Sequence, residues 1–153
     1  FVLGLGLSLA PIGAYLAAGG GFDTIPIIYS FAVLCWVSGF DIIYALQDVD
    51  FDRSLSLHSV PVSLGRGRAL QLSIFLHIIC AALILLAAFL LQNTYPAFFW
   101  LHWLAAALFI SLLIYQHTIV KPNDLSKVNR AFFTANGMAS LIFGALVILD
   151  IYF

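Results

Sequence analysis

The stretch ALQLSIFLHIICAALILLAAFLL, residues 69–91, decides the fold, because it runs for 23 residues without a charged side chain. About 20 consecutive apolar residues are enough to cross the hydrocarbon core of a bilayer. The rest of the chain has the same character, since 63% of all residues are hydrophobic and only 8% are charged. A soluble domain carries about a quarter charged residues. The sequence therefore predicts an all-α integral membrane protein whose main partner is the lipid bilayer and not nucleic acid.

Working outward from this segment, apolar runs separated by short polar, Gly or Pro breaks predict a polytopic bundle of five transmembrane helices. They cover about residues 2–18, 25–47, 69–91, 96–120 and 130–152. All six Lys and Arg residues lie between the second and third helices or between the fourth and fifth. The positive-inside rule therefore predicts that these two connections face the cytoplasm.

Four carboxylates, Asp41, Asp48, Asp50 and Asp52, stand at the end of the second predicted helix, in a chain with few charges. Carboxylates that lie close together repel one another and are costly near lipid, so a divalent cation is the natural compensation. If the helix continues through this segment, Asp41, Asp48 and Asp52 share one face. Asp50 then points to solvent on the opposite face, and Tyr44 borders the acidic stripe.

Asp48 and Asp52 form a D-x-x-x-D pair, whose Cβ atoms lie about 5–6 Å apart on a helix. Mg²⁺ suits such a pair, because it takes one or two protein carboxylates and completes its shell with water and substrate phosphate. Asp41 lies deeper in the membrane, where burying a charged side chain is costly. We therefore expect a water-filled cavity or a functional partner beside it. Two plainer interpretations stay open: a solvated, charged helix end for the pair, and a helix-packing contact for Asp41.

These residues resemble the second signature of the UbiA superfamily of intramembrane aromatic prenyltransferases, D-x-x-Y-x-x-x-D-x-x-x-D, with Asp41, Tyr44, Asp48 and Asp52 at its fixed positions. The segments LAPIGAY at residues 9–15 and SVPVSLG at residues 59–65 resemble further parts of the family, so the likeness covers essentially the whole chain. It implies a nine-helix enzyme of which residues 1–153 are the C-terminal half. It also implies an upstream N-D-x-x-D motif, without which this fragment is inactive.

The resemblance further implies an enzyme of the bacterial inner (plasma) membrane that joins a polyprenyl diphosphate to an aromatic acceptor in quinone biosynthesis. Asp48 and Asp52 would hold Mg²⁺ on the cytoplasmic side. Asp41 would orient the acceptor or take its proton, and Tyr44 would hydrogen-bond a substrate. The acceptor is of the 4-hydroxybenzoate type by this resemblance, but His58 stands where many such relatives show lysine. The segment around it looks more like menaquinone enzymes that prenylate a dihydroxynaphthoate, so the acceptor stays open between the ubiquinone and menaquinone pathways.

The basic residues near the acidic segment are weaker site candidates. Arg53, Arg66 and Arg68, together with His58, could contact a diphosphate or a carboxylate. Basic side chains at cytoplasmic helix ends also serve as ordinary membrane anchors. Two rival functions remain: a proton- or cation-coupled transporter in which Asp41 carries the ion, and a noncatalytic scaffold in which the aspartate pair is replaceable.

Histidine and cysteine add little to the candidate site. His77, His102 and His117 lie inside predicted helices without metal-ligand spacing, and we expect packed or interfacial imidazoles. Cys35 and Cys80 lie in apolar segments without a CxxC pattern, and we expect buried thiols instead of a disulfide or a metal site.

Overall fold

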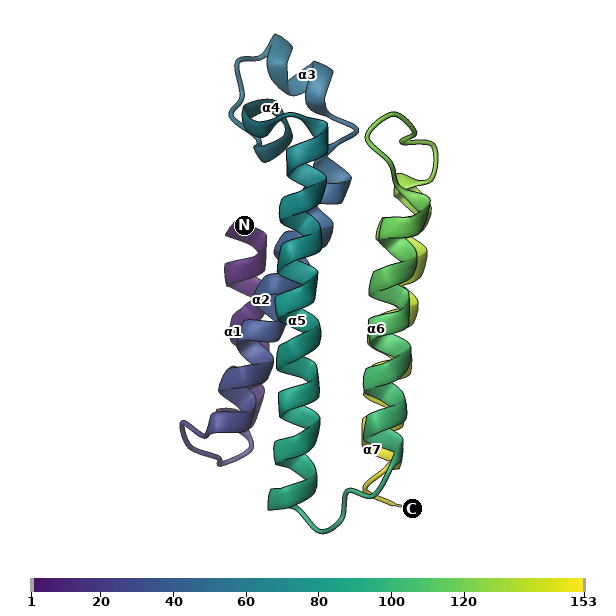
Figure 1. Ribbon diagram of the computed structural model, residues 1–153. Helices are drawn as coiled ribbons and strands as arrows, with labels where there is room; N and C mark the ends of the chain where they lie inside the picture. The colour runs from purple at the N-terminus through teal and green to yellow at the C-terminus, as the bar shows by residue number, and fades with distance from the viewer. Residues whose placement is uncertain (1, 153) are drawn as a thin grey trace.

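The computed structural model describes residues 2–152, which form helices joined by short turns, with no β-strand in that range (Figure 1). The helices are α1 (Val2–Ala17), α2 (Thr24–Ala45), α3 (Val49–Ser54), α4 (Val60–Leu64), α5 (Arg66–Thr94), α6 (Leu101–Ile119), the π-helix η1 (Arg130–Ala135) and α7 (Asn136–Leu149). Figure 1 shows α1, α2 and α5 grouped on one side, with α6 and α7 beside them. The all-α bundle predicted from the sequence is confirmed.

Four of the helical rods are long and apolar enough to cross a membrane: α2, α5, α6, and η1 joined to α7. α1 is equally apolar but has 16 residues, fewer than the about 20 that a full crossing needs. α5 has 29 residues and is therefore about 43 Å long at 1.5 Å per residue. This exceeds the roughly 30 Å hydrocarbon core, so its ends extend into the interfacial region. The chain is an integral membrane protein by its helices.

The predicted helix boundaries hold to within three residues, except at the start of α6. That helix was expected from about residue 96 but begins at Leu101. Residues 95–100 form a turn in which the N–H of Phe98 donates to the carbonyl of Tyr95. The Asp150 carboxylate then accepts the backbone N–H groups of residues 99 to 102. A residue 50 positions away thus decides where α6 begins.

The expectation of one continuous helix from Asp41 through Asp52 is wrong. α2 ends at Ala45, and Leu46 and Gln47 form a tight turn before α3 begins at Val49, with Asp48 as its N-cap. Leu46 and Val49 are both buried. A straight extension would carry Val49 beyond the apolar end of the bundle, whereas the turn folds it back under cover. Hydrophobic burial therefore overrides the helix periodicity at this point.

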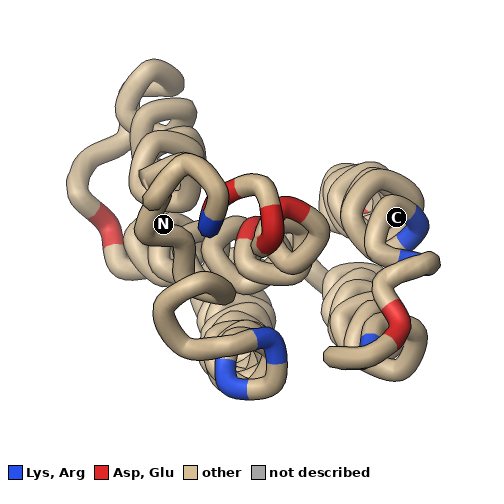
Figure 2. The backbone as a smooth tube through the Cα atoms, turned by 90° about the horizontal axis from the view of Figure 1, so that it is seen from above, with Lys and Arg blue, Asp and Glu red and all other residues tan. Residues whose placement is uncertain are grey.

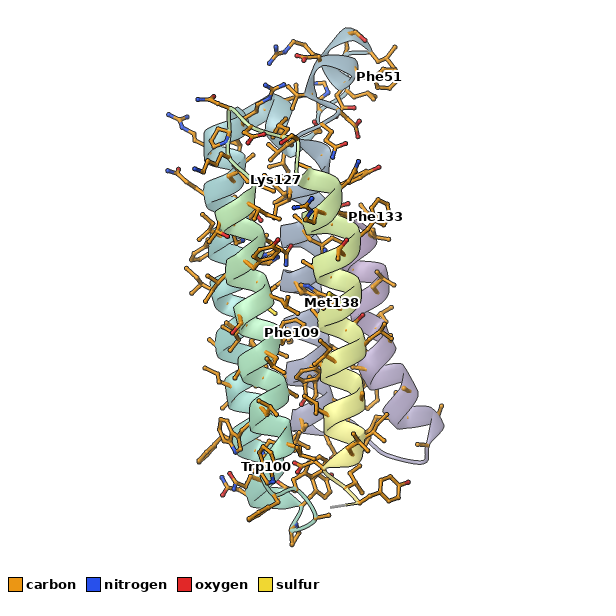
Figure 3. All side chains as sticks on the ribbon, turned by 90° about the vertical axis from the view of Figure 1, so that its right-hand side faces the viewer. Phe51, Trp100, Phe109, Lys127, Phe133 and Met138 are labelled. Atoms are coloured by element: carbon orange, nitrogen blue, oxygen red, sulfur yellow. The ribbon has the colours of Figure 1, made fainter. Side chains whose placement is uncertain are left out.

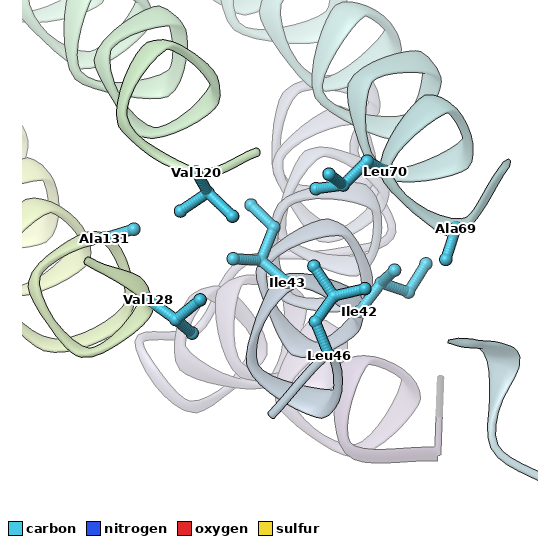
Figure 4. Close-up of a cluster of buried hydrophobic side chains, with 8 residues drawn as sticks. All are labelled: Ile42, Ile43, Leu46, Ala69, Leu70, Val120, Val128 and Ala131. Atoms are coloured by element: carbon cyan, nitrogen blue, oxygen red, sulfur yellow. The ribbon is translucent and has the colours of Figure 1, made fainter. Parts of the chain in front are cut away.

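A cluster of buried aliphatic side chains closes the bundle just below α3 (Figure 4). It brings together the ends of α2, α5, α6 and η1 through Ile42, Ile43, Leu46, Ala69, Leu70, Val120, Val128 and Ala131. Ile43, Leu46, Ala69, Val128 and Ala131 have no exposed surface at all. This packing anchors the end of α2, and with it the acidic segment, against the rest of the bundle.

α2 and α5 approach each other closely at Gly39, in the middle of the bundle. A Cβ at this position would lie 2.4 Å from the ring of His77, and the Ser73 hydroxyl donates to the Gly39 carbonyl at 2.7 Å. One His77 nitrogen lies 3.2 Å from the Trp36 carbonyl and the other 2.8 Å from His117. These polar contacts join α2, α5 and α6. In membrane proteins, small residues allow helices to approach closely, and interhelical hydrogen bonds stabilise their packing.

Candidate functional site

The charged residues divide the bundle into two unlike ends. The charged end carries all six Lys and Arg residues and comprises α3, α4, the start of α5 and the segment from Lys121 to Arg130. In Figure 2, which looks down on this end, the acidic segments around α3 lie between the basic start of α5 and the basic segment leading into η1. The opposite end, at the bottom of Figure 1, carries only Asp23 and Asp150. The predicted site residues at the charged end are Asp48, Asp52, Arg53, His58, Arg66 and Arg68, whereas Asp41 and Tyr44 lie just before it on α2.

Asp48, Asp50 and Asp52 occupy the first turn of α3. Asp48 is the N-cap, and its carbonyl accepts the N–H of Asp52 at 2.7 Å, so the two residues of the predicted pair stay one helical turn apart. Carboxylates are favoured at this position, because the free N–H groups of a helix start carry partial positive charge. Among residues 2–152, neither the Asp48 nor the Asp52 side chain makes a hydrogen bond or an ion pair. The pair is therefore available for a ligand.

Although the continuous helix on which the expectation depended is broken after Ala45, Asp50 is exposed to solvent as expected. Its side chain is 83% exposed, and its one ion pair is a 3.5 Å contact with Arg66 at the start of α5. Arg66 reaches α3 because Gly65, with φ at +79°, reverses the chain between α4 and α5. A non-glycine residue adopts that backbone conformation only with strain.

The other weak candidates lie on the surface of the charged end. Arg53 closes α3, His58 lies in the loop before α4, and Arg68 is in the first turn of α5; all three are exposed. None forms an ion pair with another described residue. A further carboxylate here, Asp124, is engaged within its own turn: hydrogen bonds from the side chain and backbone N–H of Ser126 hold its pKa below the ordinary value.

Asp41 and Tyr44 lie in the last turns of α2, on the face that lines an apolar cleft. The cleft, of about 430 Å³, lies between α1, α2 and α7 and is lined by Leu7, Ala10, Pro11, Val33, Trp36, Val37, Phe40, Asn136, Gly137 and Ser140. Val33, Val37, Asp41 and Tyr44 follow one another at spacings of four, four and three residues, which is one stripe of a helix. Asp41 and Tyr44 therefore continue the wall of this inner cleft toward the charged end.

Aromatic rings from two helices meet above the inner cleft. Tyr44 packs on Phe132 of η1 with ring centroids 4.4 Å apart, and Phe132 in turn contacts Phe40 at 5.3 Å. Trp36 continues the row at 5.6 Å from Phe40 and donates its indole N–H to the Asn136 side chain at 3.3 Å. The sequence analysis missed this row, because its rings have the same spacing as ordinary packing residues.

Two further hollows lie next to the inner cleft, farther from the charged end. One of about 160 Å³ shares Trp36 with the cleft and reaches Tyr29, and one of about 470 Å³ begins at Tyr29 and ends among the side chains of the opposite end. From Phe40 to Ile25, α2 covers about 22 Å at 1.5 Å per residue. We call these three neighbouring hollows, which share lining residues, the trough.

The three histidines inside the helices, which we expected to be packed or interfacial, each have a polar partner in the structure. His77 and His117 border a separate apolar groove of about 400 Å³ between α5 and α6. His102 lies 2.5 Å from Asp150 at the opposite end, and both side chains are 1% exposed. These pairs join residues 40 and 48 positions apart, so no local sequence pattern could have revealed them. Cys35 and Cys80 are free thiols, of which Cys80 is buried as expected and Cys35 is only half-buried.

Comparison with known proteins matches residues 1–138 to the family described as UbiA prenyltransferase. The chain belongs to the UbiA prenyltransferase family. It is 30% identical over 152 residues to the 4-hydroxybenzoate octaprenyltransferase of Aeromonas hydrophila subsp. hydrophila, and 29% identical over 147 residues to the protein of the same description from Tolumonas auensis. Each alignment covers 96% of this chain and 49% of the relative, so the chain spans about half the length of these relatives. No solved structure matches the chain.

The carboxylates of α3 fit Mg²⁺ better than they fit a metal ion whose ligands all come from the protein. No group of three or more His, Cys, Asp or Glu side chains within residues 2–152 is placed to hold a metal ion. Zn²⁺ and Ca²⁺ sites usually need at least that many protein ligands. Mg²⁺ commonly takes only one or two carboxylates and fills its shell with water and phosphate oxygens, and the unengaged pair of α3 offers two.

Proposed function

We propose that this chain works as the second half of a membrane prenyltransferase that joins a polyprenyl diphosphate to an aromatic acceptor, with Mg²⁺ as cofactor. The observation that carries the proposal is the unengaged pair Asp48 and Asp52, one helical turn apart, at the end of the helix that lines the inner cleft. Membership of the UbiA family supports the same reaction class. The first aspartate motif and the other helices of the nine would come from the rest of the protein.

The diphosphate of the donor would lie at the charged end. When bound, Mg²⁺ would neutralise the charge that develops on the leaving diphosphate, with Asp48 and Asp52 as its protein ligands. Arg53, Arg66, Arg68 and His58 lie on the same surface and are further candidates for contacts with the diphosphate oxygens. Of these, Arg66 forms an ion pair with Asp50 and therefore lies next to α3.

The polyprenyl tail would lie in the trough. Its walls are almost entirely apolar, and its three hollows follow one another from Phe40, next to Asp41, toward the opposite end of the bundle. An apolar tail gains by leaving the water at the charged end, at about 25 cal/mol for each Å² of surface buried. A donor placed in this way has its reactive carbon between the tail in the trough and the diphosphate at α3.

The aromatic acceptor would bind where the inner cleft meets Asp41 and Tyr44. Asp41 can orient the acceptor or accept the proton that the ring loses, and the Tyr44 hydroxyl can hydrogen-bond either substrate. The surrounding apolar walls exclude water, which would otherwise consume the reactive intermediate. Both residues lie within one helical turn of each other on α2.

The two curated relatives named above are described as 4-hydroxybenzoate octaprenyltransferases, which favours 4-hydroxybenzoate as the acceptor of this protein also. His58 keeps a dihydroxynaphthoate of the menaquinone pathway as the alternative acceptor. In either case we place the enzyme in the bacterial inner membrane, with the charged end in the cytoplasm according to the positive-inside rule. The family match favours this function over an ion-coupled transporter.

The test is prenyl transfer by the full-length protein in lipid, with 4-hydroxybenzoate and a dihydroxynaphthoate offered separately beside a polyprenyl diphosphate. We expect product with one acceptor in the presence of Mg²⁺ and none after chelation. The acceptor that reacts identifies the pathway. Absence of product from both acceptors, with folded protein and Mg²⁺ present, would contradict the proposal.

A further inference from the structure

Two neighbouring hollows lie between α5 and α6. The larger, of about 400 Å³, is the apolar groove described above, and the second, of about 330 Å³, lies next to it toward the charged end. They share Ile74 and His117 as lining residues, and we call the two together the α5–α6 groove. Along α5 the lining residues run from Gly67 to Ala81, which is about 21 Å at 1.5 Å per residue. One leaflet contributes about 15 Å to the hydrocarbon core, so the groove is long enough to reach from the membrane surface through a leaflet.

The polarity of the lining changes along the α5–α6 groove. The part farther from the charged end is lined by the apolar side chains of Ile78 and Ala81 on α5 and Ile110 on α6. The part at the charged end adds the side chains of Gln71 and Lys121. The polar side chains nearer the middle are those of His77, His117 and Thr118. This order matches an anionic lipid, whose chains lie in the hydrocarbon core and whose phosphate lies at the membrane surface.

The apolar part of the α5–α6 groove is open on the surface of the described chain. Ile78 and Ile114, which line it from α5 and α6, are 62% and 60% exposed. Within residues 2–152, the whole lining comes from α5, α6 and the residues that follow α6 directly. In a membrane, the apolar partner of such side chains is either a lipid chain or another helix.

The charge at the polar end of the groove favours the lipid. Lys121 is exposed and forms no ion pair with another described residue. Asp124, in the same turn, accepts hydrogen bonds from Ser126 instead. Gly67 lines this end too, and a Cβ there would meet no atom within 4 Å, so a head group has space beside α5. An apolar helix packed into the groove would leave the charge of Lys121 unmatched, whereas an anionic lipid matches the charge and covers the apolar part.

We propose that the α5–α6 groove binds an anionic phospholipid, with its phosphate at Lys121 and one acyl chain along Ile114 and Ile78. Basic pockets between transmembrane helices are a recurrent kind of site for anionic head groups. A lipid in this position contacts both helices and thereby stabilises α5 against α6. The groove shares no lining residue with the trough and none with the residues proposed to bind the diphosphate or the acceptor. The inference therefore stands apart from the proposed function.

The experiment measures, by native mass spectrometry of the full-length protein, the affinities for phosphatidylglycerol, which is anionic, and for phosphatidylcholine with the same chains, which has no net charge. We expect phosphatidylglycerol to bind at least about fivefold more tightly and Lys121→Gln to remove most of this preference, since one Lys beside an anionic head group is worth about fivefold in affinity. Lys127→Gln is the matched control. It removes the same charge from the same segment of the charged end (Figure 3) but lines neither hollow, so it should keep the preference. Absence of a preference in wild type, or equal loss in the two variants, would overturn the inference.

A second measurement tests the position of the acyl chain. Ala81→Trp fills the apolar part of the groove and should weaken the binding of phosphatidylglycerol about tenfold, the effect of excluding about two methylene groups from contact. Ala107→Trp adds the same ring to an exposed position of α6 outside the groove and should bind as wild type does. Glycerol phosphate, the head group without chains, should not compete. Equal binding by the two Trp variants, or full competition by glycerol phosphate, would contradict a lipid in the groove. Neither measurement involves prenyl transfer, so its failure is distinguishable from failure of the proposed function.

Discussion

The carboxylates at the two ends of the bundle differ in burial and in hydrogen bonding. At the opposite end, the Asp150 side chain is buried and accepts four backbone N–H groups as well as the His102 ring. At the charged end, Asp48 and Asp52 lie near the surface of α3 without a partner among the described residues. A buried carboxylate is stable only when its hydrogen bonds are satisfied within the protein. We conclude that Asp150 has a structural role, and we propose that Asp48 and Asp52 bind a ligand.

The electrostatic setting of Asp150 supports its structural role. Burial alone would raise its pKa, but hydrogen bonds from His102 and from the N–H groups of Leu101 and Phe99 outweigh burial and lower the pKa below the ordinary value. The carboxylate thus serves as the N-terminal cap of α6, supplied by the far end of α7. It ties the last two helices together at the end remote from the proposed chemistry.

The largest expected effect concerns the α3 pair. In the full-length protein, Asp48→Ala or Asp52→Ala should lower prenyl transfer at least about a hundredfold, since the metal is expected to supply several kcal/mol of transition-state stabilisation. Thermal stability should hardly change, because neither side chain holds the fold together. Asp50→Ala is the matched control in the same turn and should retain most activity. Equal loss in all three variants would remove the distinction between Asp50 and the pair.

Replacing the buried Asp150 should lower stability and leave prenyl transfer almost unchanged. Asp150→Ala leaves several donors unsatisfied and His102 without its partner, so it should lower the free energy of unfolding by about 3 kcal/mol. Thermal unfolding in detergent measures the loss. The transfer rate per folded molecule should stay close to wild type. An unaltered melting temperature would show that Asp150 does not anchor α6.

The pH dependence of stability should distinguish the two ends further. Because the pKa of Asp150 is lowered in the folded state, its contribution is complete above the pKa of an unfolded aspartate, about 3.9. It is lost as the pH falls through the lower folded value. Melting temperatures between pH 3 and pH 6 should therefore fall more steeply on the acid side for wild type than for Asp150→Asn. Parallel curves for the two proteins would contradict this sign.

The smallest expected effect concerns the exposed ion pair of the charged end. Arg66→Ala should change the free energy of unfolding by less than about 0.5 kcal/mol, because solvent screens the 3.5 Å contact with Asp50. The same variant tests Arg66 as a diphosphate ligand: a raised KM for the donor at unchanged stability would support that contact. A large loss of stability would contradict a minor contribution of the Arg66–Asp50 ion pair to folding.

Much of the fold could be predicted because it depends on local composition. Long apolar runs specify the helices, and residues such as Gly65 mark their ends. The break after Ala45 could not be predicted, because it depends on the burial of Leu46 in a cluster whose members from Ala69 onward lie more than 20 positions away. The Asp48–Asp52 spacing survived that error, since both residues fell within one short helix.

The site could be predicted only where its chemistry is unusual for a membrane protein. Aspartates stand out in an apolar chain, so the acidic segment was found. Phe132 and Trp36 are ordinary in composition, and the row of ring contacts that they make depends on helix packing that no local pattern encodes. The His102–Asp150 pair escaped for the same reason, since its partners lie 48 residues apart.

The most direct test of the α3 pair is the binding of Mn²⁺, as a spectroscopic substitute for Mg²⁺, to the full-length protein with and without a non-reactive polyprenyl diphosphate analogue. We expect electron paramagnetic resonance to detect bound Mn²⁺ that is strengthened by the analogue and lost in Asp48→Ala and Asp52→Ala but kept in Asp50→Ala. Equal binding in wild type and in the Asp48→Ala and Asp52→Ala variants would contradict the account.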